Sequence, residues 1–356
     1  MISRGYLHVP RIIVGVDTHK DEHVAVAVDK LGVRIGQRTL PTTNTGYLGL
    51  EHWASSLGEI DAFGVEGTGS YGAGLARFLR GQGHKVIEVN RPDRSARRRL
   101  GKSDPTDAEM AARAVIAGVA SDRPKSGVDK VEMIRMLKST KDSAMKGRTQ
   151  AINQMKALIV TAPVELRAVL RGLITNQLVA CCARWHQGQL GTPTAAAKYA
   201  LRSLARRYIQ LTHEIEALDA QLALLTAAFA PALLESFGIG PDTAATLLVT
   251  AGSNPERLKS EAAFAALCGV SPVPASSGKT NRHWLNRGGD RQANAALYRI
   301  VIVRLRYHDQ TRIYFRRRIE EGKTKTEVIR CLKRYVAREV FNILHDIGKR
   351  HMAWNA

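Results

Sequence analysis

The first apolar run of the chain ends on a single carboxylate, in the segment Ile12-Ile-Val-Gly-Val-Asp17. A second apolar run, from His23 to Asp29, follows after only five residues. Short apolar runs of this kind are typical of buried strands in an α/β sheet. Because the ends of such strands open into a crevice where these folds bind ligands, we expect Asp17 to be one of several carboxylates gathered around metal ions.

Three more strands and three helices are predicted before residue 124. The strands are expected at residues 33–40, 61–66 and 85–89, and the helices at 44–57, 71–79 and from 103 onward. Three consecutive strands followed by alternating helices and strands match the order of a ribonuclease H-like α/β fold. Asn44 or Thr45 should cap the first helix, and Ser103 or Asp104 the last. We therefore predict an N-terminal domain over residues 1–124.

Residues 125–232 are predicted to be a helical connector. Its clearest feature is a series of apolar residues that alternate spacings of three and four: Leu201, Leu204, Tyr208, Leu211, Ile215, Leu218, Leu222, Leu225 and Phe229. Such a pattern indicates a coiled coil, formed within one chain or between subunits. The alternative is a long amphipathic helix packed on its own domain.

Residues 233–356 are expected to form a mainly helical C-terminal domain. It opens with two helices joined by Gly238-Ile-Gly240, which resembles a helix-hairpin-helix whose second helix could bind a phosphate at its N-terminus. The alternative is a plain αα-hairpin without a ligand. A loop rich in proline and serine spans residues 269–282, and helix follows almost to the end.

The charge of the chain is its most unusual bulk property. The 356 residues carry a net charge of +21, and residues 279–356 alone contain 19 Lys and Arg against seven Asp and Glu. Such a basic protein is expected to bind a polyanion, and nucleic acid is the commonest one. A generic basic surface, as in a ribosome-associated or membrane-surface protein, is the alternative. The C-terminal part is therefore the predicted duplex-binding region.

The remaining composition argues against several classes of protein. The four cysteines form no C-x-x-C pair, so neither a zinc ribbon nor a disulfide framework is indicated. The N-terminus does not resemble a signal peptide, and no uncharged run is long enough to cross a bilayer. We expect a soluble protein of a reducing cytoplasm, without membrane association.

Four carboxylates are the predicted catalytic and metal-binding residues: Asp17, Glu66, Asp104 and Asp107. Strands one and four of a ribonuclease H-like sheet are neighbours, so the first two acids should be adjacent, and the last two share the first turn of one helix. Such oxygens suit Mg²⁺ (or Mn²⁺), and two such ions can support phosphoryl transfer. The alternative for the helical pair is simple stabilisation of a helix N-terminus.

Basic residues and two histidines near this tetrad are further candidate functional residues. The loop after the fifth strand is a predicted phosphate contact through Arg94, Arg97, Arg98, Arg99 and Lys102. His19 and His23 straddle a strand start and are predicted not to form a metal site, although His19 is close enough in sequence to Asp17 to support it.

Three segments together resemble a known family. G-V-D-T-H-K-D, V-E-G-T-G-S-Y-G and K-S-D-P-T-D-A, in this order, are similar to the DEDD-type insertion-sequence transposases, relatives of the Piv invertase and of bridge-RNA-guided recombinases. The C-terminal pattern G-x-x-P-x-x-x-x-S-G of that family is matched by Gly269, Pro272, Ser277 and Gly278. The resemblance covers residues from about 12 to 320.

The resemblance implies a RuvC-like N-terminal domain with the tetrad as its metal pocket. It also implies that Ser277 becomes covalently joined to DNA, with Ser276 as the adjacent alternative, and that a structured RNA guides recombination in some members. Positive charge beside this serine comes from Lys279, Arg282, Arg287 and Arg291. We expect the tetrad and the serine to form a composite site upon assembly of subunits.

Two other functions remain open at this point. A RuvC-like junction nuclease would need the tetrad but not Ser277, because water would attack the phosphodiester. A non-catalytic nucleic-acid-binding scaffold would need only the basic C-terminus and the coiled coil. The leading prediction is a transposase that exchanges strands of donor and target DNA in the cytoplasm of a prokaryotic cell, at the nucleoid.

Overall fold

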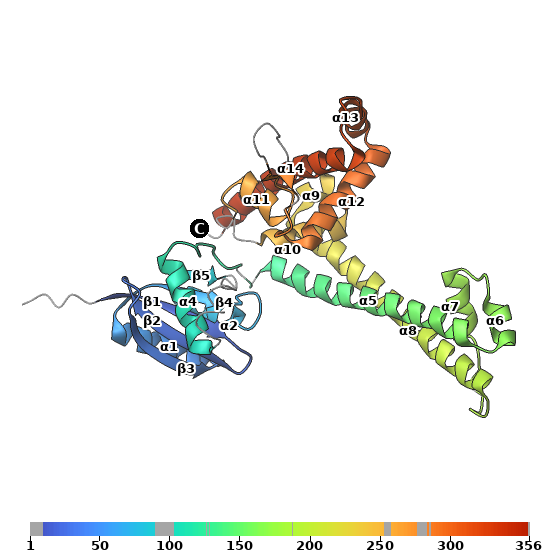
Figure 1. Cartoon of the computed structure of the whole chain (residues 1–356), viewed down its shortest axis with the longest axis horizontal. Helices are drawn as coiled ribbons and strands as arrows, with labels where there is room; N and C mark the ends of the chain where they lie inside the picture. Colours follow the sequence, from blue (N-terminus) through green and yellow to red (C-terminus); the bar gives the residue numbers. More distant parts are fainter. Residues whose placement is uncertain are drawn as a thin grey trace, which may run out of the picture. The chain divides into compact units, whose positions relative to one another are not determined.

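The computed structural model describes residues 10–89, 103–125, 127, 129–186, 188–252, 258–275, 283–284 and 286–354. The chain divides into two compact units. The first lies within residues 1–128 and includes Gly252, and the second comprises residues 129–251 and 258–356. The first is a helix-covered sheet, whereas the second is almost entirely helical (Figure 1).

The first unit contains a five-stranded sheet in the order β3-β2-β1-β4-β5. Its strands are β1 (Arg11–Thr18), β2 (Glu22–Asp29), β3 (Arg34–Pro41), β4 (Glu59–Glu66) and β5 (Val86–Val89). The first three strands are antiparallel neighbours, and β4 and β5 run parallel to β1. This order and these directions are those of a ribonuclease H-like sheet, so the predicted α/β class is confirmed.

Helices cover both faces of this sheet. Helices α1 (Asn44–Leu57) and α2 (Ala73–Gly81) share one core with Ile12, Val14 and Val16 of β1. Helix α4 (Asp104–Ile116) packs on the opposite face, against alternate residues of β1 and β2. Because side chains alternate between faces along a strand, Ile13, Gly15 and Asp17 all point toward α4.

Two predicted details of these helices were wrong. Helix α1 is capped by Thr43, whose hydroxyl accepts a hydrogen bond from the Gly46 amide at 3.1 Å, and not by Asn44 or Thr45. Helix α2 begins at Ala73 instead of residue 71, because a turn in which the Gly67 carbonyl accepts from the amides of Ser70 and Gly72 occupies the preceding residues. The predicted cap of α4 by Ser103 is confirmed.

In the second unit two long helices lie side by side and antiparallel (Figure 1). They are α5 (Lys130–Thr161) and α8 (Pro193–Phe229), connected through α6 (Val164–Leu170) and α7 (Thr175–Ala183). All nine apolar positions of the predicted heptad pattern are buried or half-buried in α8. The helix contacts α5 of the same chain, as at Gly147, where a Cβ would lie 3.3 Å from Leu211, and its two ends join the cores of α6–α7 and of the C-terminal helices. Pairing between subunits stays a prediction.

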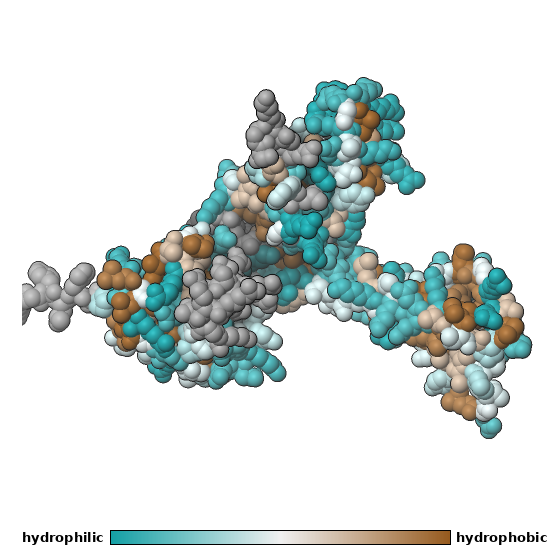
Figure 2. All heavy atoms as spheres, viewed as in Figure 1, coloured by the Kyte–Doolittle hydropathy of each residue, from teal (hydrophilic) through white to brown (hydrophobic). Residues whose placement is uncertain are grey.

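The ends of this helix pair differ in surface character. At the end carrying α6 and α7, Figure 2 shows hydrophobic patches. Exposed apolar residues in this part of the chain are Val160, Val164, Val169 and Ile174. At the other end, Ile134 of α5 and Leu222 of α8 join the hydrophobic core of the C-terminal helices. The division of this unit into a connector and a C-terminal domain at residue 232 remains a prediction.

The C-terminal helices are α9 (Pro231–Glu235), α10 (Pro241–Ala251), α11 (Glu261–Leu267), α12 (Arg291–Tyr307), α13 (Asp309–Glu320) and α14 (Lys325–Trp354). The predicted helical character is confirmed, with breaks at His308 and near Gly322. A short ribbon of β6 (Val273–Pro274) and β7 (His283–Trp284) was not predicted. In the described part of the chain, no helix is both long and apolar enough to cross a membrane.

Candidate metal centre

Two of the predicted acids end neighbouring parallel strands. In the pairing of β1 with β4, Val16 lies opposite Val65, so that the next residues, Asp17 and Glu66, are side by side. The Thr18 hydroxyl donates a hydrogen bond to the Glu66 carbonyl at 3.0 Å and ties the two strand ends together. The predicted adjacency of these acids is therefore observed.

Two glycines allow α4 to lie directly on these strands. Gly15 of β1 and Gly64 of β4 are register partners. A Cβ atom at Gly15 would lie 1.9 Å from the Ala108 carbonyl oxygen, and one at Gly64 would lie 3.0 Å from the Ala111 carbonyl oxygen. The helix backbone thus occupies the space that side chains would fill on any other residue. This close approach holds the first turn of α4 at the end of β1.

That first turn carries the other two predicted acids. Asp104 and Ala108 are four residues apart, as are Asp107 and Ala111, so each acid lies one turn before an alanine packed on the sheet. Asp107 is buried, with an exposed fraction of 2%, whereas nearly half of the Asp104 side chain is exposed. The helix therefore presents one buried and one accessible carboxylate near Asp17.

The charge of this acid group is poorly solvated. Burial raises the pKa of Asp17 above its ordinary value of 3.8; the nearby His19 lowers it, and the negative charges of Asp107 and Asp104 raise it further. Carboxylates that repel one another in this way are stabilised by a cation placed between them. This electrostatic situation fits a divalent metal ion.

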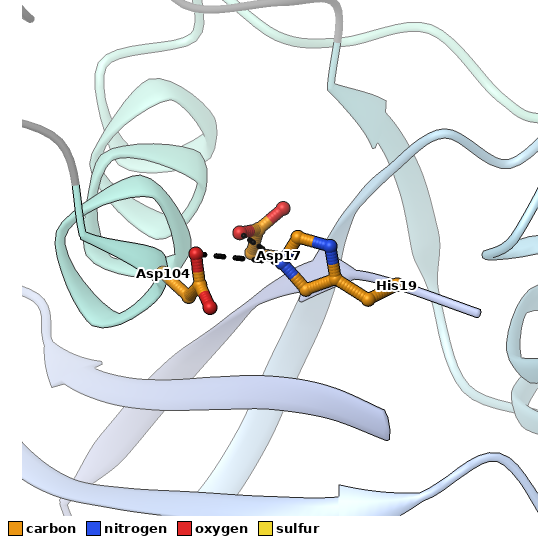
Figure 3. A group of neighbouring side chains, drawn as sticks. All are labelled: Asp17, His19 and Asp104. Carbon is orange, nitrogen blue, oxygen red and sulfur yellow. Dashed lines mark ion pairs between the residues drawn. The ribbon is translucent and has the colours of Figure 1, made fainter. Parts of the chain in front are cut away.

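The His19 ring approaches two of the carboxylates, those of Asp17 and Asp104 (Figure 3). Its Nε2 atom is 3.2 Å from Asp17 Oδ2 and 3.4 Å from Asp104 Oδ1. One donor atom from each of these three residues lies within 4.8 Å of the others, which is close enough for a single ion to contact all three. Among the described residues, Glu66 and Asp107 do not belong to this closest group.

The two histidines that straddle the strand start have different surroundings, and His19, expected to support Asp17, is the one that joins the acids. His23 is fully buried; its ring stacks on Tyr47, and its Nδ1 lies 3.1 Å from the Glu22 carbonyl oxygen. His19, in contrast, follows Asp17 by two residues at the turn after β1. The sequence placed His19 near Asp17 but gave no indication of its contact with Asp104.

Most predicted nucleic-acid contacts fall outside the described residues. These are Arg94, Arg97, Arg98, Arg99, Lys102, Lys279 and Arg282, and the same holds for Ser276 and Ser277. Arg287 and Arg291 are described, and both are exposed, with Arg291 at the start of α12. The ribbon of β6 and β7 flanks the chain segment that contains the two serines.

The hairpin before α10 favours the plain αα-hairpin over a phosphate site. Helix α10 begins at Pro241 as predicted, but the carboxylate of Asp242 in its first turn accepts a hydrogen bond from Lys141 at 2.7 Å. Lys138 and Arg299 also approach that carboxylate, at 3.3 and 3.2 Å. Burial alone would raise the pKa of Asp242, but these cations lower it, so the helix N-terminus already has its anion.

A second basic group, on α13 and α14, was not singled out from the sequence. It consists of Tyr314, Arg317, Arg318, Tyr335 and Arg338, which we call the tyrosine–arginine cluster. Arg317 and Arg318 lie over the Tyr314 ring at 5.5 and 5.9 Å, and Arg338 lies over Tyr335 at 5.9 Å. The two tyrosine rings meet edge to face, with centroids 5.6 Å apart. The visible surface around α13 is mostly hydrophilic (Figure 2).

Comparison with protein families matches both ends of the chain. Residues 14–162 match a family model of DEDD transposases of the IS110 type, and residues 230–316 match the transposase IS116/IS110/IS902 family. The chain belongs to the IS110-type DEDD transposases. It is therefore a DNA transposase, a member of an enzyme class that cleaves and rejoins DNA, and the predicted family resemblance is confirmed. A DEDD transposase implies use of a divalent metal ion.

Two similar proteins belong to insertion elements. The uncharacterized 43.6 kDa protein of insertion element IS110 from Streptomyces coelicolor is 32% identical over 148 residues, which cover 40% of this transposase and 36% of that protein. The uncharacterized 42 kDa protein of insertion element IS900 from Mycobacterium paratuberculosis is 23% identical over 394 residues, which cover 95% and 97% of the two chains. The second similarity thus extends over nearly the whole transposase.

Proposed function

We propose that this transposase moves an insertion sequence by cleaving and rejoining DNA at a RuvC-like metal centre of Asp17, Glu66, Asp104 and Asp107. The observation that carries the proposal is the contact of α4 with Gly15 and Gly64, because it brings acids distant in sequence to the ends of β1 and β4. Mg²⁺ or Mn²⁺ at this centre would supply charge stabilisation to the attacking and leaving oxygens of the phosphodiester.

The four carboxylates have different proposed roles at this centre. Asp17 and Asp104 offer carboxylate oxygens within reach of one ion, and the half-exposed Asp104 is accessible from solvent. The buried Asp107 adds negative charge without contact to solvent. Glu66, tied to Thr18 through its backbone, holds the second strand end in place and is the proposed fourth ligand.

We further propose that Ser277 is the nucleophile, with Ser276 as the alternative. Attack by the serine oxygen on phosphorus would form a Ser–O–P bond and break the P–O3′ bond. The serine proton is lost to solvent or a base, and the departing 3′ oxygen takes up a proton, leaving a 5′-phosphoserine and a free 3′-hydroxyl. The support is the G-x-x-P-x-x-x-x-S-G pattern at residues 269–278 and the match of the flanking segment to the transposase family.

A denaturing gel with end-labelled DNA tests this mechanism. We expect a covalent protein–DNA adduct with the wild-type protein, none with Ser277→Ala, and strongly reduced adduct with Asp17→Ala. Cleavage by Ser277→Ala without any adduct would point to water attack, as in a RuvC-like junction nuclease. An adduct retained by Ser277→Ala but lost in Ser276→Ala would transfer the role to the neighbouring serine.

Duplex DNA is the proposed substrate of the basic C-terminal surface. Arg287 and Arg291 are exposed at the start of α12, and the tyrosine–arginine cluster lies on the next two helices. Stacking on a tyrosine limits the freedom of each guanidinium. Arg317, with a 65% exposed side chain, is the best placed to reach a phosphate, because Arg318 and Arg338 are paired with Glu321 and Glu261. Donor and target DNA would be held in the cytoplasm of a prokaryotic cell, at the nucleoid.

A guide RNA and an oligomer complete the proposal. The same polybasic surface suits RNA phosphates, and the family resemblance is what suggests a bridge RNA. Sequencing of RNA that copurifies after nuclease treatment tests this point; recombination of a fixed site by RNA-free protein would contradict it. Assembly into a dimer or tetramer through a coiled coil would let one subunit's serine act with another's metal centre, which mixed-mutant complementation can test.

A further inference from the structure

The turn that carries His19 is braced by a third strand. The His19 amide donates a hydrogen bond to the Glu22 carbonyl at 3.2 Å, which closes the turn between β1 and β2. At the end of β3, Thr42 donates from its amide to the Asp21 carbonyl at 3.1 Å and from its hydroxyl to the Lys20 carbonyl at 3.0 Å. The backbone of His19 is therefore fixed relative to the acid-bearing strand ends.

The side chain of His19 reaches inward from this turn. Although 47% of the side chain is exposed, its Nε2 atom is close to the carboxylates of both Asp17 and Asp104 (Figure 3). The contact joins the turn after β1 to the first turn of α4, two elements that meet only because of the glycine-mediated packing of the helix. A neutral imidazole held in this position can offer a nitrogen lone pair to a cation.

The distances match the ligand edges of an octahedral ion. Adjacent ligands of an ion with bonds of about 2.1 Å are separated by about 3.0 Å, and opposite ligands by about 4.2 Å. The distances from Nε2 to the two carboxylate oxygens, 3.2 and 3.4 Å, are close to the adjacent spacing. One ion can therefore take both carboxylates and the imidazole as ligands after shifts of a few tenths of an ångström.

We propose that His19 is a ligand of the ion held by Asp17 and Asp104 and makes this transposase prefer Mn²⁺ to Mg²⁺. The inference rests on the proposed metal centre and adds to it the identity of one ligand and the choice of ion. Mg²⁺ binds almost only oxygen ligands and keeps several waters, whereas first-row transition ions accept imidazole nitrogen readily. A nitrogen ligand thus stabilises bound Mn²⁺ more than bound Mg²⁺.

Binding measurements on the full-length protein test the preference. Titration calorimetry with Mn²⁺ and Mg²⁺ should show that His19→Ala weakens Mn²⁺ binding at least about tenfold and Mg²⁺ binding much less. His19→Asp restores an oxygen donor, so this variant should recover the affinity for Mg²⁺ but should not recover the preference for Mn²⁺. The control is His213→Ala, which removes an exposed histidine from α8. Equal losses for the two ions in His19→Ala would overturn the proposed preference.

Pulsed electron paramagnetic resonance gives a readout that a merely structural role would not change. Mn²⁺ bound to the wild type should show coupling to a ligand nitrogen, which changes on ¹⁵N-histidine labelling and disappears in His19→Ala and His19→Gln. Circular dichroism of both variants should be measured as a control for folding.

The possible results distinguish a failure of the proposed role of His19 from a failure of the proposed metal centre. Mn²⁺ that binds the wild type, is lost in Asp17→Asn and shows no nitrogen coupling would overturn the role of His19 alone. Mn²⁺ and Mg²⁺ binding that is unaffected by Asp17→Asn, or absent from the wild type, would overturn the metal centre and His19 together.

Discussion

The substitution Gly15→Ala should abolish the metal centre without changing any acid. An alanine Cβ at this position would lie 1.9 Å from the Ala108 carbonyl oxygen and 2.5 Å from the Ala112 amide nitrogen. Ordinary contact begins at 3.4 Å, so α4 must move away from β1 by about 1.5 Å. Both overlapping atoms belong to the helix backbone, and no rotation of a side chain can relieve the overlap.

The size of this displacement determines the expected loss. Metal–ligand distances tolerate changes of about 0.2 Å, so a shift of more than an ångström removes Asp104 from an ion held by Asp17. The overlap should also destabilise the first unit by about 3 kcal/mol, the upper part of the usual cost of overpacking. At Gly64 a Cβ would lie 2.8 Å from a methyl group of Val115 and 3.0 Å from the Ala111 carbonyl oxygen, so Gly64→Ala should cause a smaller shift.

Calorimetry with Mn²⁺ and thermal melts of the same samples measure both effects. We expect metal affinity to fall in the order wild type, Gly64→Ala, Gly15→Ala. Gly81→Ala is the matched control, because nothing lies within 4 Å of a Cβ at that position in α2. Should Gly15→Ala bind Mn²⁺ as tightly as the wild type while remaining folded, the argument that α4 packing assembles the site would be refuted.

The remaining predictions concern charge. Asp17→Asn should raise the melting temperature of metal-free protein, because carboxylates within 4.8 Å repel by about 3 kcal/mol at an effective dielectric of 20 and about 1 kcal/mol in water; no rise in the presence of a chelator would contradict this. Since the pKa of Asp17 is raised, metal-free stability should fall as pH rises through that folded-state pKa, above 3.8, and Mn²⁺ affinity should fall as pH is lowered through it. Calorimetry over a pH series checks both, and Asp17→Asn should flatten the stability trend. Arg317→Gln should weaken DNA binding and reduce the salt dependence of log K by about 0.9 if it contacts one phosphate, whereas Arg171→Gln, at the C-cap of α6, should not; equal effects would remove the tyrosine–arginine cluster from the interface. Lys141→Met should destabilise the helical unit by about 1–2 kcal/mol in a denaturant titration, because Asp219 and Asp242 lose their shared buried donor while Asp242 keeps Lys138 and Arg299; the exposed Lys146→Met is its control. Equal midpoints for these two variants would show that the buried contact contributes little.

Local pattern was sufficient for much of the fold. The apolar runs ending at Asp17 and Glu66 correctly predicted two strands, and the order of the elements predicted that these strands are neighbours. The spacing of leucines from 201 to 229 correctly predicted the buried side of a long helix. These predictions succeed because strand and helix periods constrain which side chains share a face, whatever the partner is.

Features that depend on packing between distant segments were missed or left open. The heptad pattern did not distinguish an internal partner from a second subunit, and α5 proved to be a partner within the chain. The pattern of the Gly238–Gly240 hairpin resembles a phosphate site. In the structure, however, Lys141, about a hundred residues away in sequence, donates a hydrogen bond to the Asp242 carboxylate at the start of the helix. Whether a helix pairs within the chain, or a hairpin binds a phosphate, depends on which distant segment contacts it. A local sequence pattern does not identify that segment.

The sequence by itself determined the carboxylates of the candidate centre, their places at strand ends and a helix start, and the family to which the chain belongs. The tertiary structure alone decided which donor atoms meet. Gly15 and Gly64 look like ordinary strand residues in the sequence, yet their missing side chains let α4 approach the sheet. That approach brings Asp104 to Asp17 and His19, because donor geometry at the ångström scale is set by backbone contact between segments about ninety residues apart.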